Sequence, residues 1–577
     1  MPALLGGALR SLQRPSLAGL RLACSLAPGP GMQTAVVRCV PGEAKMTISF
    51  ELDGGHRRLE REQSECLRAA LARIANNVLK AQTRPKKGRK AAAAAQAQAQ
   101  ATAPDVSLHL GEEAVPGDTR NAEAWQDGAV LQVGEGRYQV QRNPPTVTRL
   151  ELPASILAGF PVCPQVQIEF GQPAESRFEW LREAVGTGTC TWEPAASGRV
   201  FTPGNSLIGS KLKLRCSPGD GSRFGPAAEL QSAGVVEAGP GVCTFDSRHL
   251  FTQEAAAEAL LRVVSYNILA DVYAQTELSK TSLYPYCAQY ALHADYRQNL
   301  IKKELSGYHA DILCLQEVDK SVFTDSLSPA MDAFGYHGLF RIKEKQHEGL
   351  ATFFRASKYR LLSQHDVTFS EALASDPLHT DLLQKVSANP NVKEKVLQRS
   401  TALQVCVLQS LEDSSRKVCI GNTHLYWHPK GGHIRLIQIA IAFRHLHQII
   451  SEMYPNTPII FCGDFNSTPT SGLYDFVTRG SISTDHQDWS SNGEEEQCRM
   501  SLTHSFKLIS ACGEPTYTNY VGGFQGCLDY IFMDVNMFEV AQVIPFPTHE
   551  EITCHLALPS VSHPSDHIAL VCDLQWK

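Results

Sequence analysis

The most regular hydrophobic pattern of the chain runs from about residue 255 to residue 577. Apolar segments of strand length, such as residues 262–270 and 310–319, alternate with segments of helical period, such as residues 432–455. Strands that are apolar on both faces are typical of sheets covered by other layers. This half therefore predicts an α/β domain of layered sheets flanked by helices. Residues 371–398 predict further helices that decorate this core.

Two modules with β-strand patterns precede this domain. Residues 35–145 show alternating strand patterns and one helical segment, interrupted at residues 83–104 by a low-complexity insertion without an apolar face. Residues 146–245 show short strands, frequent turns and a Trp180 followed by Cys216, which favours a small immunoglobulin-like β-sandwich. Neither module carries a constellation of catalytic residues, so we interpret both as binding or positioning modules.

The first 34 residues are rich in arginine, and no acidic residue occurs before Glu43. This composition is typical of a mitochondrial transit peptide, so we expect the mature protein in the mitochondrial matrix. A disordered tail and a secretory signal are the alternatives. The spread-out arginines fit a secretory signal poorly, because such a signal places its charge before one apolar block.

Charge and hydrophobicity narrow the class of protein. The formal net charge is −6 and the pI is near 6.4, which argues against the broad basic surface that grips duplex DNA. No stretch of about 18 apolar residues occurs, so no membrane span is expected. The 17 cysteines are scattered singly, which favours buried free thiols in a reducing compartment over disulfides.

Polar side chains sit at the ends of the apolar strands in the C-terminal half. Singly, each has an ordinary explanation, since Asp and Asn cap turns and a lone His is often a satisfied core group. Together they predict one cleft where the strand ends converge. Burying such groups without partners costs roughly several kcal/mol each, so the cleft requires a cation. The residues are Asn267, Glu317, Asn422, His424, Asp464, Asn466, Asp529, Asp566 and His567.

The ligand types indicate which cation. The oxygen donors of Glu317, Asp464, Asn267 and Asn466 suit a hard ion, Mg²⁺ or Mn²⁺, better than zinc. A hard ion beside imidazoles implies phosphoester chemistry, because Mg²⁺ keeps waters and binds substrate phosphate oxygens. The segment "GDFN" at residues 463–466 then delivers a base, Asp464, and a phosphate-positioning amide, Asn466, to a rigid rim.

These motifs, in the order N…QE…NTH…GDFN…DY…SDH, resemble the exonuclease–endonuclease–phosphatase superfamily over roughly residues 255 to 577. The resemblance implies a four-layer, DNase I-like α/β sandwich. Within the superfamily, "NTHLYWHP" and "YTNYVGGFQGCLDYIF" resemble the CCR4-type deadenylase branch. The segments "SYNILADVYAQTE" and "LYPYCA", behind two β modules and a presequence, are similar to its mitochondrial members, which degrade 2′,5′-linked oligoadenylates and 3′ poly(A) tails.

The resemblance also implies roles for the metal-binding residues. Glu317 is expected to be the principal Mg²⁺ ligand, with Asn267 nearby. Asp464 is expected either to activate the attacking water or to hold the metal. Asn466 is expected to bind the scissile phosphate beside the metal.

Further roles fall on the imidazoles and their neighbours. His567, oriented by Asp529, is expected to stabilise the transition state or to protonate the leaving oxygen, with Asp566 in support or near the metal. His424, supported by Glu348, is expected to contact the phosphate from the other side.

Three more residues complete the implied substrate site. Asn422 belongs to the strand-end set, and Pro429 and Phe524 match positions that sandwich adenine in the deadenylase branch. Stacking of this kind suits single-stranded substrates. The resemblance thus implies an Mg²⁺-dependent phosphodiesterase and 3′-exoribonuclease that acts on single-stranded RNA and short oligoadenylates and releases AMP.

Other functions compete with this hypothesis. Another phosphoesterase of the same superfamily, such as a sphingomyelinase-like enzyme or a general nuclease, uses similar residues. From a different class, an inactive RNA-binding adaptor would rely on the β modules. Every expected catalytic position holds a chemically competent residue, which favours the enzyme. The sequence does not specify linkage preference or protein partners.

Overall fold

The computed structural model describes residues 32–52, 54–82, 103–184, 191–343 and 346–577. The chain divides into two compact units. One comprises Met1–Leu150, Val166–Glu179 and Arg215–Glu229, and the other comprises Glu151–Gln165, Trp180–Leu214 and Leu230–Lys577. The predicted transit peptide and low-complexity insertion lie almost entirely outside the described residues.

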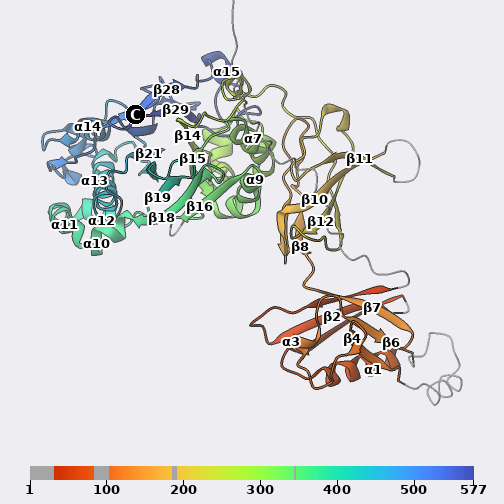
Figure 1. Ribbon diagram of the computed structural model, residues 1–577. Coiled ribbons are helices and arrows are strands. Elements are labelled where there is room, and N and C mark those ends of the chain that lie inside the picture. Colours follow the sequence, from red (N-terminus) through yellow and green to blue (C-terminus); the bar gives the residue numbers. More distant parts are fainter. Residues whose placement is uncertain (1–31, 53, 83–102, 185–190, 344–345) are drawn as a thin grey trace, which may run out of the picture. The chain divides into compact units, whose positions relative to one another are not determined.

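The first unit contains a seven-stranded sheet in the order β3-β2-β1-β7-β6-β4-β5. Figure 1 shows β2, β4, β6 and β7 of this sheet with helix α1 beside them. Helix α1 covers this sheet, because Leu67, Ala70 and Ile74 recur at helical spacing and enter its buried core. The alternating segments predicted here are strands. Their bounds are β1 (Gln33–Arg38), β2 (Lys45–Leu52), β3 (Gly55–Glu62), β4 (Val106–Leu110), β5 (Glu113–Ala114), β6 (Val130–Val133) and β7 (Gly136–Arg142), with α1 (Leu67–Gln82) and α3 (Asn121–Ala124).

The region after residue 145 also forms strands. A four-stranded sheet has the order β11-β10-β12-β13, and β8 pairs with β9. Trp180 and Cys216 are both buried, on the neighbouring strands β10 and β12. The immunoglobulin-like topology stays a prediction. The bounds are β8 (Thr146–Glu151), β9 (Gln165–Glu169), β10 (Gln172–Glu183), β11 (Trp192–Ser197), η1 (Asn205–Leu207), β12 (Leu212–Gly219) and β13 (Ala228–Gln231).

Two six-stranded sheets form the scaffold of the C-terminal half. The first has the order β16-β17-β15-β14-β29-β28 and the second the order β18-β19-β20-β21-β27-β24. The first comprises β14 (Leu260–Asn267), β15 (Ile312–Asp319), β16 (Tyr336–Ile342), β17 (Glu348–Arg355), β28 (Phe538–Val543) and β29 (Leu570–Trp576). The second comprises β18 (Tyr359–Thr368), β19 (Ala402–Ser410), β20 (Lys417–His424), β21 (Ile459–Asp464), β24 (Leu508–Ser510) and β27 (Asp529–Asp534).

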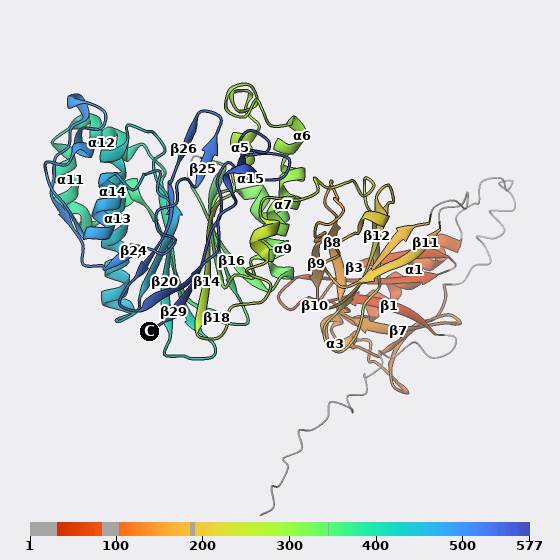
Figure 2. The same cartoon turned by 90° about the horizontal axis from the view of Figure 1, so that it is seen from above.

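The sheets pack against each other, and helices cover their outer faces (Figure 2). Val263 of the first sheet and Ile460 of the second belong to one buried cluster. Ile301 of α7 and Met331 of α9 join the core on the outer face of the first sheet, and Ile437 of α13 joins the core on that of the second. Central strands such as β15 and β21 are thus covered on both faces, and the prediction of a layered α/β domain is confirmed. The helices are α7 (Ala294–Gly307), α9 (Ser328–Ala333), α13 (Gly432–Gln448) and α14 (Gly472–Arg479).

Shorter elements decorate this core. The helical insertion predicted at residues 371–398 is present as α10 (Phe369–Ser375), η4 (Pro377–His379), α11 (Thr380–Ser387) and α12 (Pro390–Leu397). The others are α4 (Asp246–His249), α5 (Asp271–Ala274), η2 (Ser279–Leu283), α6 (Gln289–Leu292), α8 (Lys320–Val322), η3 (Phe323–Leu327), η5 (Ile449–Met453), β22 (Ser481–Ile482), η6 (Gln487–Ser490), η7 (Glu494–Glu496), β23 (Leu502–Thr503), β25 (Asn519–Val521), β26 (Phe524–Gly526) and α15 (His549–Thr553).

The state of the cysteines and the length of the helices bear on two further expectations. The cysteines of the described residues are free thiols, and all of them except Cys66 and Cys554 are buried. Within the described parts of the chain, no helix is both long and apolar enough to cross a membrane.

Candidate active site

Three neighbouring strands of the second sheet place polar side chains in one row. β20 and β21 are parallel, with His424 opposite Asp464, and β21 and β27 are antiparallel, with Asp464 opposite Asp529. In the first sheet, β14 ends at Asn267, and the neighbouring strand β15 carries Glu317. Strand ends from both sheets therefore supply the candidate residues.

Asn267 joins these two sets of residues. Its Nδ2 donates to Glu317 Oε1 at 3.0 Å and to Asp464 Oδ2 at 3.0 Å. The second oxygen of each carboxylate accepts a backbone N–H, from Ala270 to Glu317 at 3.0 Å and from Asn466 to Asp464 at 2.9 Å. Because one amide group reaches both carboxylates, the two acids point into the same space.

The backbone at two of these positions adopts an uncommon conformation. Glu317 has φ 54° and Asn466 has φ 49°, and Glu317 lies where the register of β15 shifts against β17. Side chains at positive φ cost about 1–3 kcal/mol and cluster at functional sites. At Gly463 an added Cβ would overlap the carbonyl oxygen of Thr423, so only glycine allows β20 and β21 to approach this closely.

The acids of the site repel one another. Burial, followed by the charges of Asp566 and Glu348, raises the pKa of Glu317 to about 7. Burial and the charge of Asp529 raise the pKa of Asp464 to about 6, although His567 and Asn267 act in the opposite direction. A carboxyl group with a raised pKa is one that lacks compensating positive charge. The site is therefore suited to a cation.

The donor set fits a hard divalent cation. Glu317 and Asp464 offer carboxylate oxygens that the Nδ2 of Asn267 links, and such oxygens are the ligands that Mg²⁺ and Mn²⁺ prefer. The oxygen expected from Asn267 accepts from Leu269 N–H at 3.0 Å, so Asn267 orients the two carboxylates. Asp464, Asp529 and His567 also bring ligand atoms within 4.8 Å of one another. In that set, His567 Nδ1 is bound to Asp529, so only Nε2 of this ring faces the site.

His567 is held as an imidazolium. Its Nδ1 donates to Asp529 Oδ2 at 2.8 Å, and its Nε2 lies 3.6 Å from Asp464 Oδ2. Burial alone would lower the pKa of His567, but Asp529 and Asp464 outweigh burial and raise this pKa well above its ordinary value. Asp529 is fixed in turn by the hydroxyl of Thr518 at 2.6 Å. The result is a charged N–H donor aimed into the site.

His424, unlike His567, is held as a neutral imidazole. Burial, with the charges of Lys343 and His567, lowers the pKa of His424 well below its ordinary value. The ammonium of Lys343 donates to His424 Nδ1 at 3.1 Å and to Glu348 Oε1 at 2.7 Å. With Nδ1 accepting, the proton of the neutral ring is on Nε2, which lies 3.7 Å from Asp464 Oδ2. The site thus holds one neutral and one charged imidazole.

Of the other predicted residues, Asp566 and Asn466 lie at the site and Asn422 lies away from it. Asp566 is half-buried, accepts from the hydroxyl of Tyr284 at 2.9 Å and raises the pKa of Glu317. Asn466 donates its amide to Leu425 O at 3.0 Å. The structure does not bring Asn422 into this group. Its Oδ1 accepts from Gln316 at 2.9 Å and its Nδ2 donates to carbonyls of β15 and β17, so it joins the two sheets in the interior.

The two residues expected to sandwich a base are on the surface. Pro429 is exposed, and Phe524, on the β25–β26 hairpin, is 47 % exposed. Sequence reasoning missed Trp427, which is 66 % exposed and two residues before Pro429. Exposed aromatic rings are suited to stacking on unpaired bases.

Sequence reasoning also missed three buried partners. Lys343 lies in the charged segment before Glu348, where its neighbours include residues of the same type, so no local signal distinguishes it. Tyr284 and Thr518 lie within "LYPYCA" and "YTNY", which carried the resemblance. The family motifs are therefore the sequence signal that could have identified Tyr284 and Thr518.

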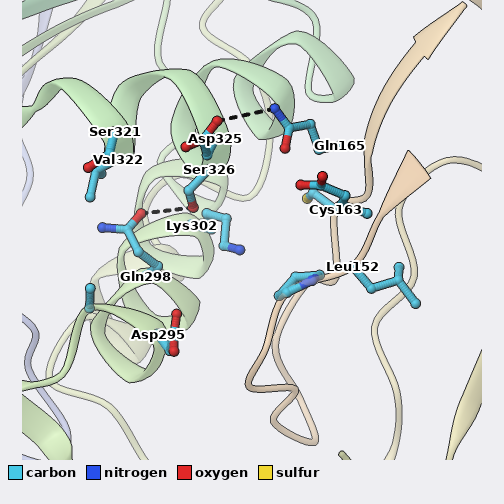
Figure 3. Close-up of a pocket in the computed structure, with 13 residues that line it drawn as sticks. Leu152, Cys163, Gln165, Asp295, Gln298, Lys302, Ser321, Val322, Asp325 and Ser326 are labelled. Atoms are coloured by element: carbon cyan, nitrogen blue, oxygen red, sulfur yellow. Dashed lines mark hydrogen bonds between the residues drawn. The ribbon is translucent and has the colours of Figure 1, made fainter. Parts of the chain in front are cut away.

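A separate cavity of about 260 Å³ contains none of the predicted site residues in its lining. Figure 3 shows Gln298 and Lys302 of α7 opposite Cys163 and Gln165. Lys302 is buried, and burial lowers its pKa. The lining combines this lysine with carboxylates and contains no imidazole. It therefore lacks the acid–base pair found at the strand ends.

Comparisons with known proteins agree with this geometry. Residues 264–567 match the endonuclease/exonuclease/phosphatase family, and residues 144–237 match the 2′,5′-phosphodiesterase 12-like N-terminal domain. The chain is 60 % identical to 2′,5′-phosphodiesterase 12 of Homo sapiens, over 95 % of this chain and 94 % of that protein. The rat protein of that name is also 60 % identical, with 95 % of each chain covered.

A more distant relative covers the catalytic half. The CCR4-Not complex 3′-5′-exoribonuclease subunit Ccr4 of Schizosaccharomyces pombe is 30 % identical, over 55 % of this chain and 49 % of that protein. The matched family spans both six-stranded sheets and contains Glu317, Asp464 and His567. The chain therefore belongs to the endonuclease/exonuclease/phosphatase family.

Proposed function

We propose that the protein hydrolyses 2′,5′-linked oligoadenylates and the 3′,5′ bonds of poly(A) tails on mitochondrial RNA, with Mg²⁺ as cofactor and AMP as product. The observation that carries this proposal is the convergence of Glu317, Asp464 and His567 through the amide of Asn267 and the carboxylate of Asp529. Membership of the family makes the protein a hydrolase that acts on phosphodiester bonds.

Asp464 acts on the attacking water. Its Oδ1 is fixed by the backbone of Asn466, and its Oδ2 faces the centre of the site. With a pKa raised to about 6, Asp464 is ionised at neutral pH and still basic enough to accept a proton. Mg²⁺ held by Glu317, whose carboxylate the Asn267 amide orients, would supply positive charge next to the phosphate oxygens.

The imidazoles act on the phosphate. His567 carries a proton that it can deliver to the leaving oxygen, or hold against the charge that develops in the transition state. Neutral His424 offers an N–H to a non-bridging oxygen without adding a second positive charge. Asp529 and Lys343 position these rings. The side-chain amide of Asn466 donates one N–H to Leu425 O and has a second N–H for a further phosphate contact.

The choice of substrate rests on the relatives. Proteins named 2′,5′-phosphodiesterase 12 match nearly the whole chain, and a protein named as a 3′-5′-exoribonuclease subunit matches its catalytic half. Exposed Phe524, Pro429 and Trp427 supply surfaces on which unpaired bases can stack. Single-stranded RNA and short oligoadenylates are the substrates that fit both observations.

Product analysis tests the proposal. The purified protein is incubated with 2′,5′- and 3′,5′-linked adenylate trimers, with Mg²⁺ or with EDTA. We expect AMP from both trimers with Mg²⁺ only, and no AMP with Glu317→Ala or Asp464→Ala. Removing one electrostatic partner of this kind costs about 10²–10³ in rate. Near-native turnover of either folded variant in excess Mg²⁺ contradicts the assignment.

The same experiment separates the alternatives. Sphingomyelin and an unrelated RNA serve as further substrates, since a sphingomyelinase-like enzyme cleaves the first and a general nuclease cleaves the second without preference for adenosine. An inactive adaptor binds oligo(A) and releases no AMP. Localisation is tested separately, with residues 1–34 fused to a fluorescent reporter, which we expect to be imported into the mitochondrial matrix.

A further inference from the structure

A second cluster of metal-binding side chains lies in the helical insertion. Asp376 precedes η4, His379 ends η4, and His445 lies in the last turn of α13. One ligand atom from each residue comes within 4.8 Å of the other two. Figure 1 shows the insertion helices α10, α11 and α12 beside α13, and Figure 2 shows α11 and α12 there. None of these residues belongs to the site described above.

The atoms are arranged as ligands. His379 Nε2 and His445 Nε2 are 3.0 Å apart and share a hydrogen bond, and His445 Nε2 is 3.9 Å from Asp376 Oδ2. An ion bound by both Nε2 atoms takes the place of the shared proton, which moves to Nδ1 of the donating ring or to solvent. Two nitrogen ligands of a tetrahedral zinc ion lie about 3.3 Å apart, given bonds of 2.0–2.1 Å. The other carboxylate oxygen, Asp376 Oδ1, accepts from the backbone N–H of Leu378 at 2.9 Å and so fixes the carboxylate.

The imidazoles are in the protonation state that metal binding needs. Burial lowers the pKa of His379 to about 4 and also lowers the pKa of His445. Neutral rings have a free lone pair. Nδ1 of His379 is buried and has no hydrogen-bond partner among the described residues, so no protein acceptor selects its tautomer. The nearby Arg444 is neutralised by Asp381, to which it donates at 2.6 Å and 2.9 Å.

We propose that Asp376, His379 and His445 bind one Zn²⁺ ion through Oδ2, Nε2 and Nε2. The Asp376 side chain is 35 % exposed, so water can occupy the fourth position and the ion can exchange with solvent. Two imidazoles and one carboxylate are a ligand set for zinc rather than for magnesium. The ion would tie the insertion helices to the C-terminal end of α13.

The helix that would carry the ion, α13, also holds the segment that follows His424. The first turn of α13 carries Arg435, which donates to the carbonyl oxygens of Tyr426 and His428. Those residues lie between His424 and the exposed Pro429. We expect Zn²⁺ to stabilise the insertion and α13 without taking part in hydrolysis.

Metal titration with matched variants tests the proposal. The metal-free protein, in millimolar Mg²⁺ to fill the catalytic site, is titrated with Co²⁺ and then Zn²⁺. Expected results are one equivalent of Co²⁺ with the visible absorption of tetrahedral coordination, its displacement by Zn²⁺, and a Zn²⁺-dependent rise in Tm. His445→Gln is expected to weaken binding at least tenfold and to abolish that rise. His447→Gln, which alters an exposed histidine of the same helical turn, is expected to bind as the unaltered protein does.

A second variant guards against misfolding. Asp376→Asn retains a side-chain oxygen for Leu378 and removes the ligand charge, so it should bind Zn²⁺ more weakly while its Mg²⁺-dependent hydrolysis stays unchanged. The proposal is overturned if His445→Gln, Asp376→Asn and His447→Gln all bind Co²⁺ alike. It is also overturned if the unaltered protein takes up no Co²⁺ in the presence of Mg²⁺.

Discussion

Replacing Glu317 by Gln should make the metal-free protein more stable and the enzyme inactive. Glu317 is half-buried near Asp566 and Glu348, and burial and these like charges raise its pKa from 4.5 to about 7. Its folded state therefore binds a proton more tightly than its unfolded state. The stability that this proton contributes is present below about pH 4.5 and is lost as the pH rises through about 7. At pH 8 the ionised carboxylate therefore lowers the free energy of unfolding.

The size of this penalty follows from the shift. A pKa that changes from 4.5 to about 7 corresponds to roughly 3 kcal/mol between pH 4 and pH 8. Gln removes the charge but cannot accept from both Asn267 and Ala270, so about 1 kcal/mol of hydrogen bonding is lost. The net gain at pH 8 is about 2 kcal/mol, which is about 4 °C in Tm for a domain of this size.

Calorimetry with and without Mg²⁺ measures the effect. Without metal at pH 8, the Tm of Glu317→Gln should exceed that of the unaltered protein. Saturating Mg²⁺ should reverse this order, because a ligand at about 100 times its Kd adds about 2.7 kcal/mol to the protein that binds it. Adenylate hydrolysis by the variant should fall by about 10²–10³.

Glu304 provides a matched control. It is a buried glutamate of α7 whose pKa burial also raises to about 7, and it accepts from Tyr308 at 2.7 Å. Glu304→Gln should alter the pH dependence of Tm but leave hydrolysis and the response to Mg²⁺ unchanged. If Glu317→Gln and the unaltered protein have equal Tm values without metal and respond equally to Mg²⁺, the reasoning about this site is refuted.

Other predictions concern the imidazoles and the substrate surface. Asp529→Asn removes the charge that holds the proton on His567, so the midpoint of the His567 titration, measured by NMR, should fall. The kcat should drop by about 10²–10⁴, most of all above pH 7. An unchanged midpoint contradicts this prediction. Lys343→Met should raise the pKa of His424, measured in the same way, because Lys343 is one of the groups that lower it. Phe524→Ala should raise KM for oligoadenylates roughly 5- to 150-fold with little change in kcat, since stacking contributes about 1–3 kcal/mol per base, and an unaltered KM would exclude a stacking role.

Several features of the fold could be predicted from the local pattern of apolar and polar residues. The strand that ends at Asp464 is apolar at Ile459, Ile460, Phe461 and Cys462, and all four are buried. A run of this kind must be covered on both faces, and a carboxylate cannot continue it into the core. The end of the strand, the polar residues there and the layered architecture therefore follow from local pattern.

Asn422 shows where that reasoning fails. Its position before "TH" at a strand end resembles that of the other candidates, yet Gln316 and the carbonyls of Leu315 and Ala351 use its polar atoms between the sheets. Which side of the strand end faces the cleft depends on the partner strands. Contacts of this kind, between strands of different sheets and residues 70 to 107 positions apart, are not encoded in the local pattern.

The sequence by itself determined the class of fold, the family motifs and the set of acids, amides and imidazoles, because these are properties of neighbouring residues in one chain. Only the tertiary structure decided what each group does. His424 and His567 look alike in sequence, but Lys343, 81 residues from His424, keeps one ring neutral, and Asp529, 38 residues from His567, keeps the other charged. A pKa depends on the charges and burial around a group, and folding alone brings those charges within reach.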